Sequence, residues 1–367
     1  MKIAIVSVFP PFRGGIARFN THMVNGLRAA NHDVIPVNFS RQYPALLFPG
    51  KSQYDRLQTS EDMPALLDSI RPKTWKKTAH YLIEQRVEWV ILPYWTGYLA
   101  PSLAAVAKNL NGIRVSGLLH NATPHDAGAL QRLLSGNFFH ACDDFITLSE
   151  AVTRDLKQRR PNATVRTLFH PIYDDGGLIK PLPKADARQS LKIDHRKKVL
   201  LFFGLIRHYK GLDLLLEAFN ALDESYHLII AGEPYIDLSP LRKIPSKSAI
   251  DRISWVTRYI NDSELPELFG AADAVVLPYR SATQSGVTAH AIHFQRPVIA
   301  CRVGGLEEYI LDGWTGCFAE PGNSDDLRRA IEHWFSSERS EQNINTAFDD
   351  LNKRMGWPRF TQLLTAT

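Results

Sequence analysis

The feature that most constrains the fold of this chain is an alternation of short apolar runs with segments of helical periodicity. The first run, Lys2–Val8, is rich in Ile and Val and stops before Pro10 and Pro11, which predicts a buried strand. Apolar residues then recur at helical spacing over residues 16–27. Further strands are predicted at Asp33–Asn38, Glu88–Pro93, Ile113–Leu119 and Asp144–Leu148. Strands that alternate with helices predict an α/β fold with a mostly parallel sheet covered on both faces.

The alternation stops and then starts again, which predicts two domains. Residues 171–198 are rich in Asp, Gly and Pro and end in a run of mixed charge, as is typical of a connection. A chain of 367 residues also exceeds the size of one ordinary core. Strands resume at Val199–Leu205, Tyr226–Ala231, Asp273–Leu277 and Pro297–Cys301, with a helix at Leu212–Phe219. We expect an N-terminal domain over 1–175, a linker over 176–197, a C-terminal domain over 198–350, and a helix within 351–367 for which packing back on the N-terminal domain is one placement.

Composition narrows the class of protein. Hydrophobic residues make up 44% of the chain and charged residues 22%, as in ordinary globular proteins. No apolar run approaches the roughly 18 residues that span a bilayer, and the first residues lack the features of a signal peptide. The three cysteines are odd in number and scattered, so the sequence predicts no disulfide framework and favours a reducing cytoplasm.

The charge is uneven along the chain. Residues 1–180 hold 21 Lys and Arg against 14 Asp and Glu, whereas the remainder holds 22 against 24. A basic N-terminal half indicates an anionic partner there, with an ordinary solvated surface as the alternative. Neither zinc-finger spacing nor an aromatic RNA-binding motif is present, so we expect no nucleic acid. We expect instead peripheral contact with an anionic membrane, at its inner face, through the basic and aromatic stretch Arg71, Lys73, Trp75, Lys76, Lys77 and Tyr81.

Ligands of open α/β sheets bind outside the carboxyl ends of the strands, so the loops that follow the strands are the candidate sites. The first such loop contains Gly14 and Gly15 and leads into a helix. Glycine lets a ligand approach the backbone closely, and the N–H groups of a helix N-terminus suit a phosphate. The loop matches neither the dinucleotide fingerprint nor the P-loop. A simple tight turn is the alternative.

Two cations, Arg207 and Lys210, lie in the loop that follows the strand ending at Leu205. Together at the start of a helix they would neutralise a diphosphate, because Arg binds phosphate oxygens in pairs and Lys acts as a point charge. The alternative is a pair of solvated surface cations.

Two later loops are small, polar and glycine-containing. The loop over residues 279–287 carries backbone N–H groups and hydroxyls suited to phosphate or sugar, with an N-capping turn as the alternative. The segment that follows Gly304 and Gly305 ends at Glu308, which either binds a ligand or caps a helix.

These loops, taken in order, resemble those of retaining glycosyltransferases of the GT-B fold, in glycosyltransferase family four. The resemblance covers nearly the whole chain and rests on PPFRGG near the start, LSEAV around Ser149, FFGLIRHYKGLDLLLEAF at 202–219, LIIAGE at 228–233, YINDSELPELFGAADAVVLPY at 259–279 and RPVIACRVGGLEEYILDGWTGCF at 296–318. It implies two Rossmann-like doubly wound domains that face a cleft. It implies a UDP- or GDP-sugar donor held mainly by the C-terminal domain and a glycan or lipid-linked acceptor on the N-terminal domain. It also implies transfer of a hexose with retained anomeric configuration, with no metal and no cofactor.

The resemblance also implies roles for individual residues. Lys210 matches the lysine on the donor diphosphate, and His120, at the end of the strand predicted at Ile113–Leu119, matches a histidine near the transferred sugar. With Arg207 these are the candidate catalytic residues. By residue type alone, His120 could equally be structural. The candidate donor-binding residues are Gly14, Gly15, Tyr259, Thr283, Gln284, Ser285, Gly286, Val287 and Glu308.

The chain departs from the family pattern at three positions. Leu205 stands after Gly204 where the family commonly has an arginine, and Arg207 is the nearest substitute. The two family glutamates fall on Ala282 and His290, so we expect the hydroxyl and amide groups of residues 283–285 to recognise the donor sugar instead. Two alternatives follow: a sugar-nucleotide epimerase on the same fold, and a non-catalytic protein that binds sugar nucleotides.

Overall fold

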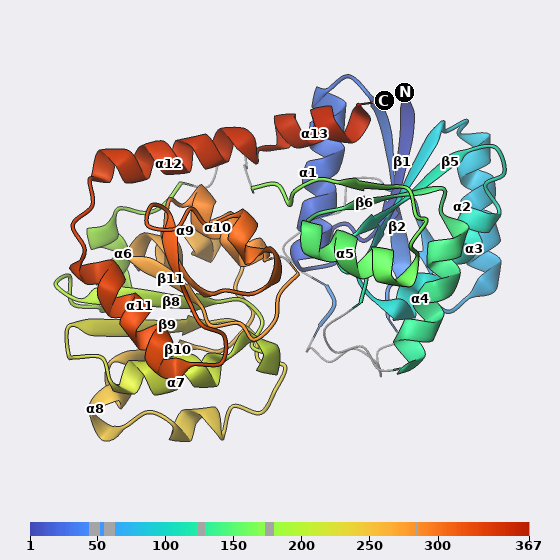
Figure 1. Cartoon of the computed structure of the whole chain (residues 1–367). Helices are drawn as coiled ribbons and strands as arrows, with labels where there is room; N and C mark the ends of the chain where they lie inside the picture. Colours follow the sequence, from blue (N-terminus) through green and yellow to red (C-terminus); the bar gives the residue numbers. More distant parts are fainter. Residues whose placement is uncertain (44–51, 55–62, 124–128, 173–179, 284, 367) are drawn as a thin grey trace. The chain divides into compact units, whose positions relative to one another are not determined.

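The computed structural model describes residues 1–43, 52–54, 63–123, 129–172, 180–283 and 285–366. The chain forms two compact units. Unit 1 comprises Met1–Pro171 together with Trp357–Thr367, and unit 2 comprises Ile172–Gly356. Each unit is built on its own parallel sheet (Figure 1).

The sheet of unit 1 has the order β3-β2-β1-β4-β5-β6-β7, and the paired strands run parallel. Its strands are β1 (Lys2–Ser7), β2 (Asp33–Arg41), β3 (Ala65–Asp68), β4 (Trp89–Tyr94), β5 (Arg114–Leu119), β6 (Asp144–Thr147) and β7 (Val165–Thr167). Its helices are α1 (Gly15–Ala29), α2 (Pro72–Glu84), the 3-10 turn η2 (Gly97–Leu99), α3 (Ala100–Lys108), α4 (Ala129–Ala141), α5 (Glu150–Arg159) and α13 (Trp357–Thr365). Ser149 caps α5 by accepting a hydrogen bond from the Val152 amide.

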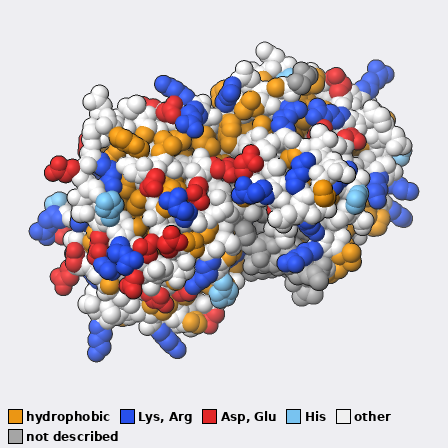
Figure 2. Space-filling view, in the orientation of Figure 1, with side chains coloured by type: hydrophobic (Ala, Val, Ile, Leu, Met, Phe, Trp, Pro, Cys, Tyr) orange, Lys and Arg blue, Asp and Glu red, His pale blue; other side chains and the backbone are white. Residues whose placement is uncertain are grey.

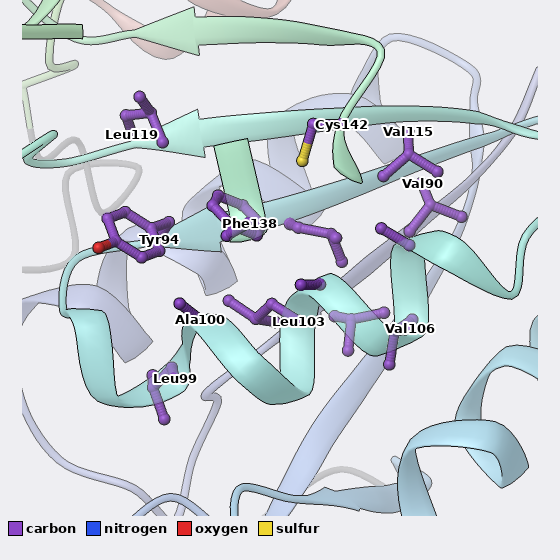
Figure 3. Packing of buried hydrophobic residues seen from close by; sticks show 14 of the residues in the cluster. Val90, Tyr94, Leu99, Ala100, Leu103, Val106, Val115, Leu119, Phe138 and Cys142 are labelled. Carbon is purple, nitrogen blue, oxygen red and sulfur yellow. The ribbon is translucent and has the colours of Figure 1, made fainter. Parts of the chain in front are cut away.

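Alternate residues of the central strands in unit 1 belong to two separate cores. On β1, Ala4 and Val6 face the core beneath α2, α3 and α4, whereas Ile3 and Ile5 face the core beneath α1 and α13. Figure 3 shows the first of these cores, which contains Leu103 and Val106 of α3 together with Val90 of β4 and Val115 of β5. A sheet covered on both faces is what the buried, β-branched strands predict.

Unit 2 repeats this plan with the strand order β10-β9-β8-β11-β12-β13, again parallel. Its strands are β8 (Lys198–Phe203), β9 (Tyr226–Ala231), β10 (Ile253–Val256), β11 (Ala274–Leu277), β12 (Val298–Cys301) and β13 (Gly316–Ala319). Its helices are α6 (Lys184–Ser190), α7 (Leu212–Asn220), α8 (Lys247–Ile250), α9 (Leu265–Ala271), α10 (Gly286–His293), α11 (Ser324–Ser336) and α12 (Glu341–Arg354), with 3-10 turns η3 (His208–Lys210), η4 (Leu241–Lys243), η5 (Asp262–Glu264) and η6 (Gly304–Glu308). On β8, Val199 and Leu201 face one core, while Leu200 and Phe202 face the other.

The structure divides the chain differently from the sequence prediction. The predicted linker over 176–197 contains α6, which packs on α9 within unit 2 and buries Ala187 in its core. Arg188 of this helix is buried and donates to the Asp273 carboxylate at 2.6 Å. The helix predicted within 351–367 is α13, which belongs to unit 1 and packs on α1, whereas the start of that segment is the end of α12 in unit 2. The residues 173–179 of the predicted boundary lie outside the described part of the chain.

Candidate functional site

The sheet of unit 2 reverses its strand order between β8 and β11, and most of the candidate donor residues follow these two strands. β8 pairs with β9 on one side and with β11 on the other, so the connections from β8 and β11 leave the sheet in opposite directions. Such a switch point leaves room for a ligand at the carboxyl ends of the strands. Lys210 lies on η3 after β8, and the loop over 278–285 follows β11.

Close backbone approaches hold these loops together. A Cβ atom on Gly211 would overlap the carbonyl oxygen of Pro278, and one on Gly304 would overlap the carbonyl oxygen of Ala282. Gly304 has φ +54°, a backbone conformation that side chains disfavour. The loops after β8, β11 and β12 are therefore in direct contact, and glycine is required where they meet.

Arg280 ties the loop after β11 to the loop after β8. Its guanidinium donates to both carboxylate oxygens of Asp213, at 2.8 and 2.6 Å, and its amide donates to the carbonyl of Tyr209 at 2.8 Å. The ion pair lowers the pKa of Asp213 and raises that of Arg280. Bidentate pairs of this kind fix orientation as well as distance. Sequence analysis missed this residue, because its partner Asp213 is remote in the sequence.

Lys210 is a buried cation at the centre of these contacts. Its side chain is 7% exposed, and its ammonium lies 5.4 Å from the centre of the Tyr279 ring. A Cβ on Gly204 would lie 2.8 Å from the Lys210 ammonium, so the absence of a side chain there makes room for the charge. Burial, with a further contribution from Arg207, lowers the pKa of Lys210 to about 7. No carboxylate in the described part of the chain forms an ion pair with it.

Arg207 lies beside Lys210 as the residue that precedes η3. Its guanidinium stacks over the Tyr235 ring, 4.8 Å from the ring centre. Because Arg207 contributes to the lowered pKa of Lys210, the two cations repel one another in the free protein. An anion placed between them would remove this repulsion.

The remaining candidate donor residues of unit 2 lie on three loops. Ser285 precedes α10, and Gly286 and Val287 form its first turn, where a Val287 methyl would be 3.4 Å from a Cβ on Gly204. Thr283 is half-buried in the same loop, and Gln284 lies outside the described residues. Glu308 ends η6 and is exposed, on the segment that Gly304 holds against Ala282. Tyr259 is half-buried in the loop after β10, two strands away from β8 in the sheet.

Ala282 and His290 stand at the two positions where the resemblance predicts glutamates, and neither is acidic. Ala282 is buried and presents its carbonyl to Gly304. His290 packs edge-on against Phe203, with ring centres 6.0 Å apart, and also contacts Phe269. Phe203 ends β8, so His290 lies at the same switch point as Lys210.

The loop after β9 also contributes to this end of unit 2, although sequence analysis assigned no role to it. Glu233 is buried, and its backbone carbonyl accepts a hydrogen bond from the Ile206 amide at 2.9 Å. A Cβ on Gly232 would overlap the Gly204 carbonyl. The signal that could have found Glu233 is its place at the end of the motif LIIAGE, directly after a predicted strand.

In unit 1, Gly14 and Gly15 form the start of α1. Gly14 has φ +111°, and a Cβ there would meet no atom within 4 Å, so the space in front of this turn is open within the described residues. Asn38 fixes the preceding loop, because its side chain accepts from the Phe9 amide at 3.0 Å and donates to the carbonyls of Phe9 and Pro10. The loop therefore presents backbone to its surroundings on a rigid support.

His120 follows β5 in unit 1 and is buried. Its amide donates to the Tyr94 carbonyl at 2.9 Å, and its ring packs edge-on against Phe19 with centres 4.7 Å apart. Burial, and secondarily the neighbouring His170, holds the pKa of His120 well below its usual range. The imidazole is therefore neutral at neutral pH. Gly14, Gly15 and His120 belong to unit 1 and the other candidates to unit 2.

Comparison with known proteins gives a consistent answer. Residues 183–348 match the family described as Glycosyl transferases group 1. A glycosyltransferase of Methanocaldococcus jannaschii, itself uncharacterized, is 28% identical over 98% of this chain and 95% of its own length. A GDP-mannose:glycolipid 4-beta-D-mannosyltransferase of Xanthomonas campestris is 27% identical over 71% of this chain and 70% of its own. The structure of HepE from Anabaena in complex with UDP and glucose covers 99% of this chain and 98% of its own, with a TM-score of 0.78 at 16% identity.

Two Rossmann-like units of this kind constitute the GT-B fold, which the solved structures share. The family match lies within unit 2, and together with the relatives it indicates that the chain is a glycosyltransferase. No helix in the described part of the chain is long and apolar enough to span a membrane.

Proposed function

We propose that this glycosyltransferase moves a hexose from a UDP- or GDP-linked donor to a hydroxyl of a glycan or lipid-linked acceptor, with retention and without a metal. The observation that carries the proposal is the buried ammonium of Lys210 with the half-buried Arg207 beside it. A buried ammonium whose pKa burial lowers to about 7 is unfavourable unless an anion binds to it. A diphosphate is the anion that fits two cations at the switch point of a doubly wound sheet.

The proposed reaction breaks the bond between the sugar C1 and the diphosphate oxygen, whose electron pair leaves with the diphosphate. The acceptor hydroxyl attacks C1 on the same face, and its proton passes to the departing phosphate oxygen. Lys210 and Arg207 stabilise the charge that develops on the leaving group, and such a positioned donor is worth roughly 3–4 kcal/mol. Thr283 and Ser285 orient the donor sugar. His120, neutral at neutral pH, accepts or donates a hydrogen bond without adding charge.

The printed names of the relatives support this class of chemistry. The Xanthomonas enzyme is named for a GDP-sugar donor and a glycolipid acceptor, and HepE was solved with UDP. The Methanocaldococcus and Xanthomonas relatives are both named as transferases, which gives the epimerase alternative no support.

We propose further that unit 1 is the part of the molecule that meets an anionic membrane. Unit 1 contains 21 Lys and Arg against 12 Asp and Glu, and unit 2 contains 22 against 26. Of the basic and aromatic stretch on α2, Trp75 donates its ring N–H to the Asp68 carbonyl at 2.7 Å, and Tyr81 packs against the core. The side chains that this stretch exposes to solvent are therefore those of Arg71 and the lysines, whereas the aromatic rings are half-buried.

A thermal-shift screen against UDP, GDP, ADP and their sugar conjugates tests the donor site. A nucleotide at 100 times its dissociation constant should stabilise wild-type protein by about 2.7 kcal/mol. Lys210→Met should abolish this shift, because it removes the cation that binds the diphosphate. Lys247→Met, which removes an exposed lysine of the same unit, is the matched control and should keep the shift. An undiminished shift in Lys210→Met would remove the diphosphate from this site, and no shift with any nucleotide would favour the non-catalytic alternative.

A further inference from the structure

Four large apolar side chains are exposed at one end of unit 1. Leu133 is 75% exposed, Leu130 61%, Ile70 51% and Tyr98 43%. Apolar side chains exposed singly are ordinary, whereas a group of them on one surface marks a binding site, so their placement decides what they mean. Each residue lies at or near the start of one of three consecutive helical segments, before α2, on η2 and in the first turns of α4.

These three helix starts share the same end of the sheet. In a parallel sheet, the connecting helix begins at the carboxyl end of the preceding strand. The helices α2, α3 and α4 also pack side by side on one face of the sheet, as Figure 1 shows. Thr96, just before η2, donates to the Gln131 side chain of α4 at 3.1 Å, and a Cβ on Gly97 would overlap the Gln131 backbone. We call the set Ile70, Tyr98, Leu130 and Leu133 the apolar rim.

Cations accompany the apolar rim. In the segments 70–73, 97–99 and 130–133, the charged residues are Arg71, Lys73 and Arg132, and all three are exposed. Arg71 is within 3.6 Å of Asp68, but that carboxylate is also paired with Arg41 at 3.0 Å, so the cluster keeps its positive sign. Figure 2 shows exposed hydrophobic side chains over α4 with Lys and Arg side chains close to them.

We propose that the apolar rim docks unit 1 on an anionic lipid bilayer, with the carboxyl ends of its strands toward the membrane. Exposed apolar side chains flanked by Lys and Arg suit the boundary between charged headgroups and acyl chains. A second copy of the same surface would bring cation against cation, which disfavours self-association through the rim. The inference deepens the proposed function and rests on it for the acceptor: the loops of Gly14 and His120 follow strands of this sheet, so docking would present them to a lipid-linked acceptor.

Flotation of the full-length protein with vesicles tests the proposal. Wild-type protein should bind vesicles of equal phosphatidylglycerol and phosphatidylcholine, should not bind pure phosphatidylcholine, and should bind less as salt is raised. The double variant Leu130→Asp, Leu133→Asp should bind at least about tenfold more weakly, because it removes two apolar anchors and adds two anionic charges. Both side chains are mostly exposed, so thermal melting should show the variant folded.

Two matched variants separate the rim from exposed apolar residues in general. Ile83→Asp changes a 44% exposed residue at the other end of α2, and Ile250→Asp changes a 53% exposed residue of unit 2. Both should bind vesicles within about twofold of wild type, by contrast with the roughly tenfold loss in the rim variant. Wild-type binding by the rim variant, or an equal loss in Ile83→Asp, would overturn the proposal. The proposal would also be overturned if light scattering showed that the rim substitutions convert a dimer to a monomer while vesicle binding stays unchanged.

Nucleotide shifts measured on the same samples keep this inference distinct from the proposed function. A rim variant that loses vesicle binding and keeps the nucleotide shift of wild type supports both. Loss of vesicle binding in the variant, with no nucleotide shift even in wild type, leaves the docking surface standing and removes the donor site. A nucleotide shift together with unchanged vesicle binding in the variant removes the docking surface alone.

Discussion

At the scale of single residues, Lys210 shows a conflict between stability and binding. The folded protein holds this ammonium in a buried position between Gly204, Tyr279 and Arg207, and its pKa falls to about 7. A core built only for stability would place an apolar side chain there. The stability that the fold gives up at Lys210 is what an anionic ligand can recover on binding.

The pH dependence of stability makes this conflict measurable. The folded pKa of Lys210 lies below its ordinary value of about 10.4, so the unfolded chain binds more protons between pH 7 and pH 10.4. The destabilising effect is complete below pH 7 and disappears as pH rises toward 10.4. We therefore expect Lys210→Met to be more stable than wild type at pH 6.5, with a difference that shrinks at pH 9.5.

Urea unfolding of both proteins at the two pH values provides the measurement. Lys247→Met serves again as the reference, because an exposed lysine has no such desolvation to relieve. A stability difference between Lys210→Met and wild type that is constant with pH would show that the ammonium is solvated in the folded state.

Some residues of this site could be predicted from the sequence alone, and others could not. Lys210 and Arg207 could be singled out because two cations before a helix fit a diphosphate, and the family resemblance marked the lysine. The burial of Lys210 could not be predicted from the sequence. It depends on Gly204 and Tyr279, which come close to the lysine only when the sheet has assembled. Arg280 escaped notice for the same reason.

At the scale of elements, the loops of unit 2 depend on contacts between strand ends. The loop after β12 rests on the loop after β11 where Gly304 meets the Ala282 carbonyl. These loops carry Thr283, Ser285 and Glu308, so their mutual contact fixes the surroundings of the proposed donor sugar.

We expect Gly304→Ala to destabilise unit 2 and to weaken nucleotide binding. The added methyl would overlap the Ala282 carbonyl, and φ +54° is unfavourable for any side chain, which costs about 1–2 kcal/mol by itself. Gly313→Ala is the matched control, because Gly313 has φ +79° but open space around its Cβ position. The excess loss in Gly304→Ala, about 1–3 kcal/mol for a forced shift of backbone, measures the contact between the loops.

Urea unfolding and nucleotide titration of the two variants give the comparison. Equal destabilisation in both variants, with equal nucleotide affinity, would mean that the loops adjust without cost and that their contact does not organise the site.

Elements were predictable where their patterns are local. The strands predicted at Lys2–Val8 and Tyr226–Ala231 are present as Lys2–Ser7 and Tyr226–Ala231, because continuous runs of β-branched and apolar residues identify buried strands. The short edge strands β3, β7, β10 and β13 and the seven-residue α6 were not predicted. Each is too short for a periodic pattern, and long-range contacts such as that of Arg188 with Asp273 stabilise it.

At the scale of the whole molecule, the chain passes from unit 1 to unit 2 after Pro171 and returns at Trp357. The returning helix α13 buries Trp357, Phe360 and Leu364 beneath α1. Phe19 of α1 contacts Trp357 at 5.2 Å and His120 at 4.7 Å between ring centres, so the end of the chain supports the packing around His120. Unit 1 is therefore complete only when the last residues have been added to it.

Gly26 of α1 lies directly against α13, and the absence of a side chain there lets the two helices pack together. A Cβ on Gly26 would lie 2.8 Å from a methyl carbon of Thr361, whose hydroxyl is bound to the carbonyls of Trp357 and Pro358 and cannot turn freely. In an unobstructed helix, glycine-to-alanine substitution stabilises by about 0.5–1 kcal/mol. We expect that sign for Gly136→Ala in α4, where the Cβ position is open, and the opposite sign for Gly26→Ala, by about 1–3 kcal/mol.

Urea unfolding compares the two variants, and the nucleotide shift reports on unit 2 in the same samples. Because Arg207 and Lys210, the cations proposed to bind the diphosphate, lie in unit 2, Gly26→Ala should lower the stability of unit 1 and keep the nucleotide shift of wild type. A stabilising Gly26→Ala would mean that α13 moves away from α1 at no cost, and the contact from Trp357 through Phe19 to His120 would then not depend on the returning helix. Loss of the nucleotide shift in Gly26→Ala would instead mean that nucleotide binding depends on the integrity of unit 1, even though the two cations proposed to bind the diphosphate belong to unit 2.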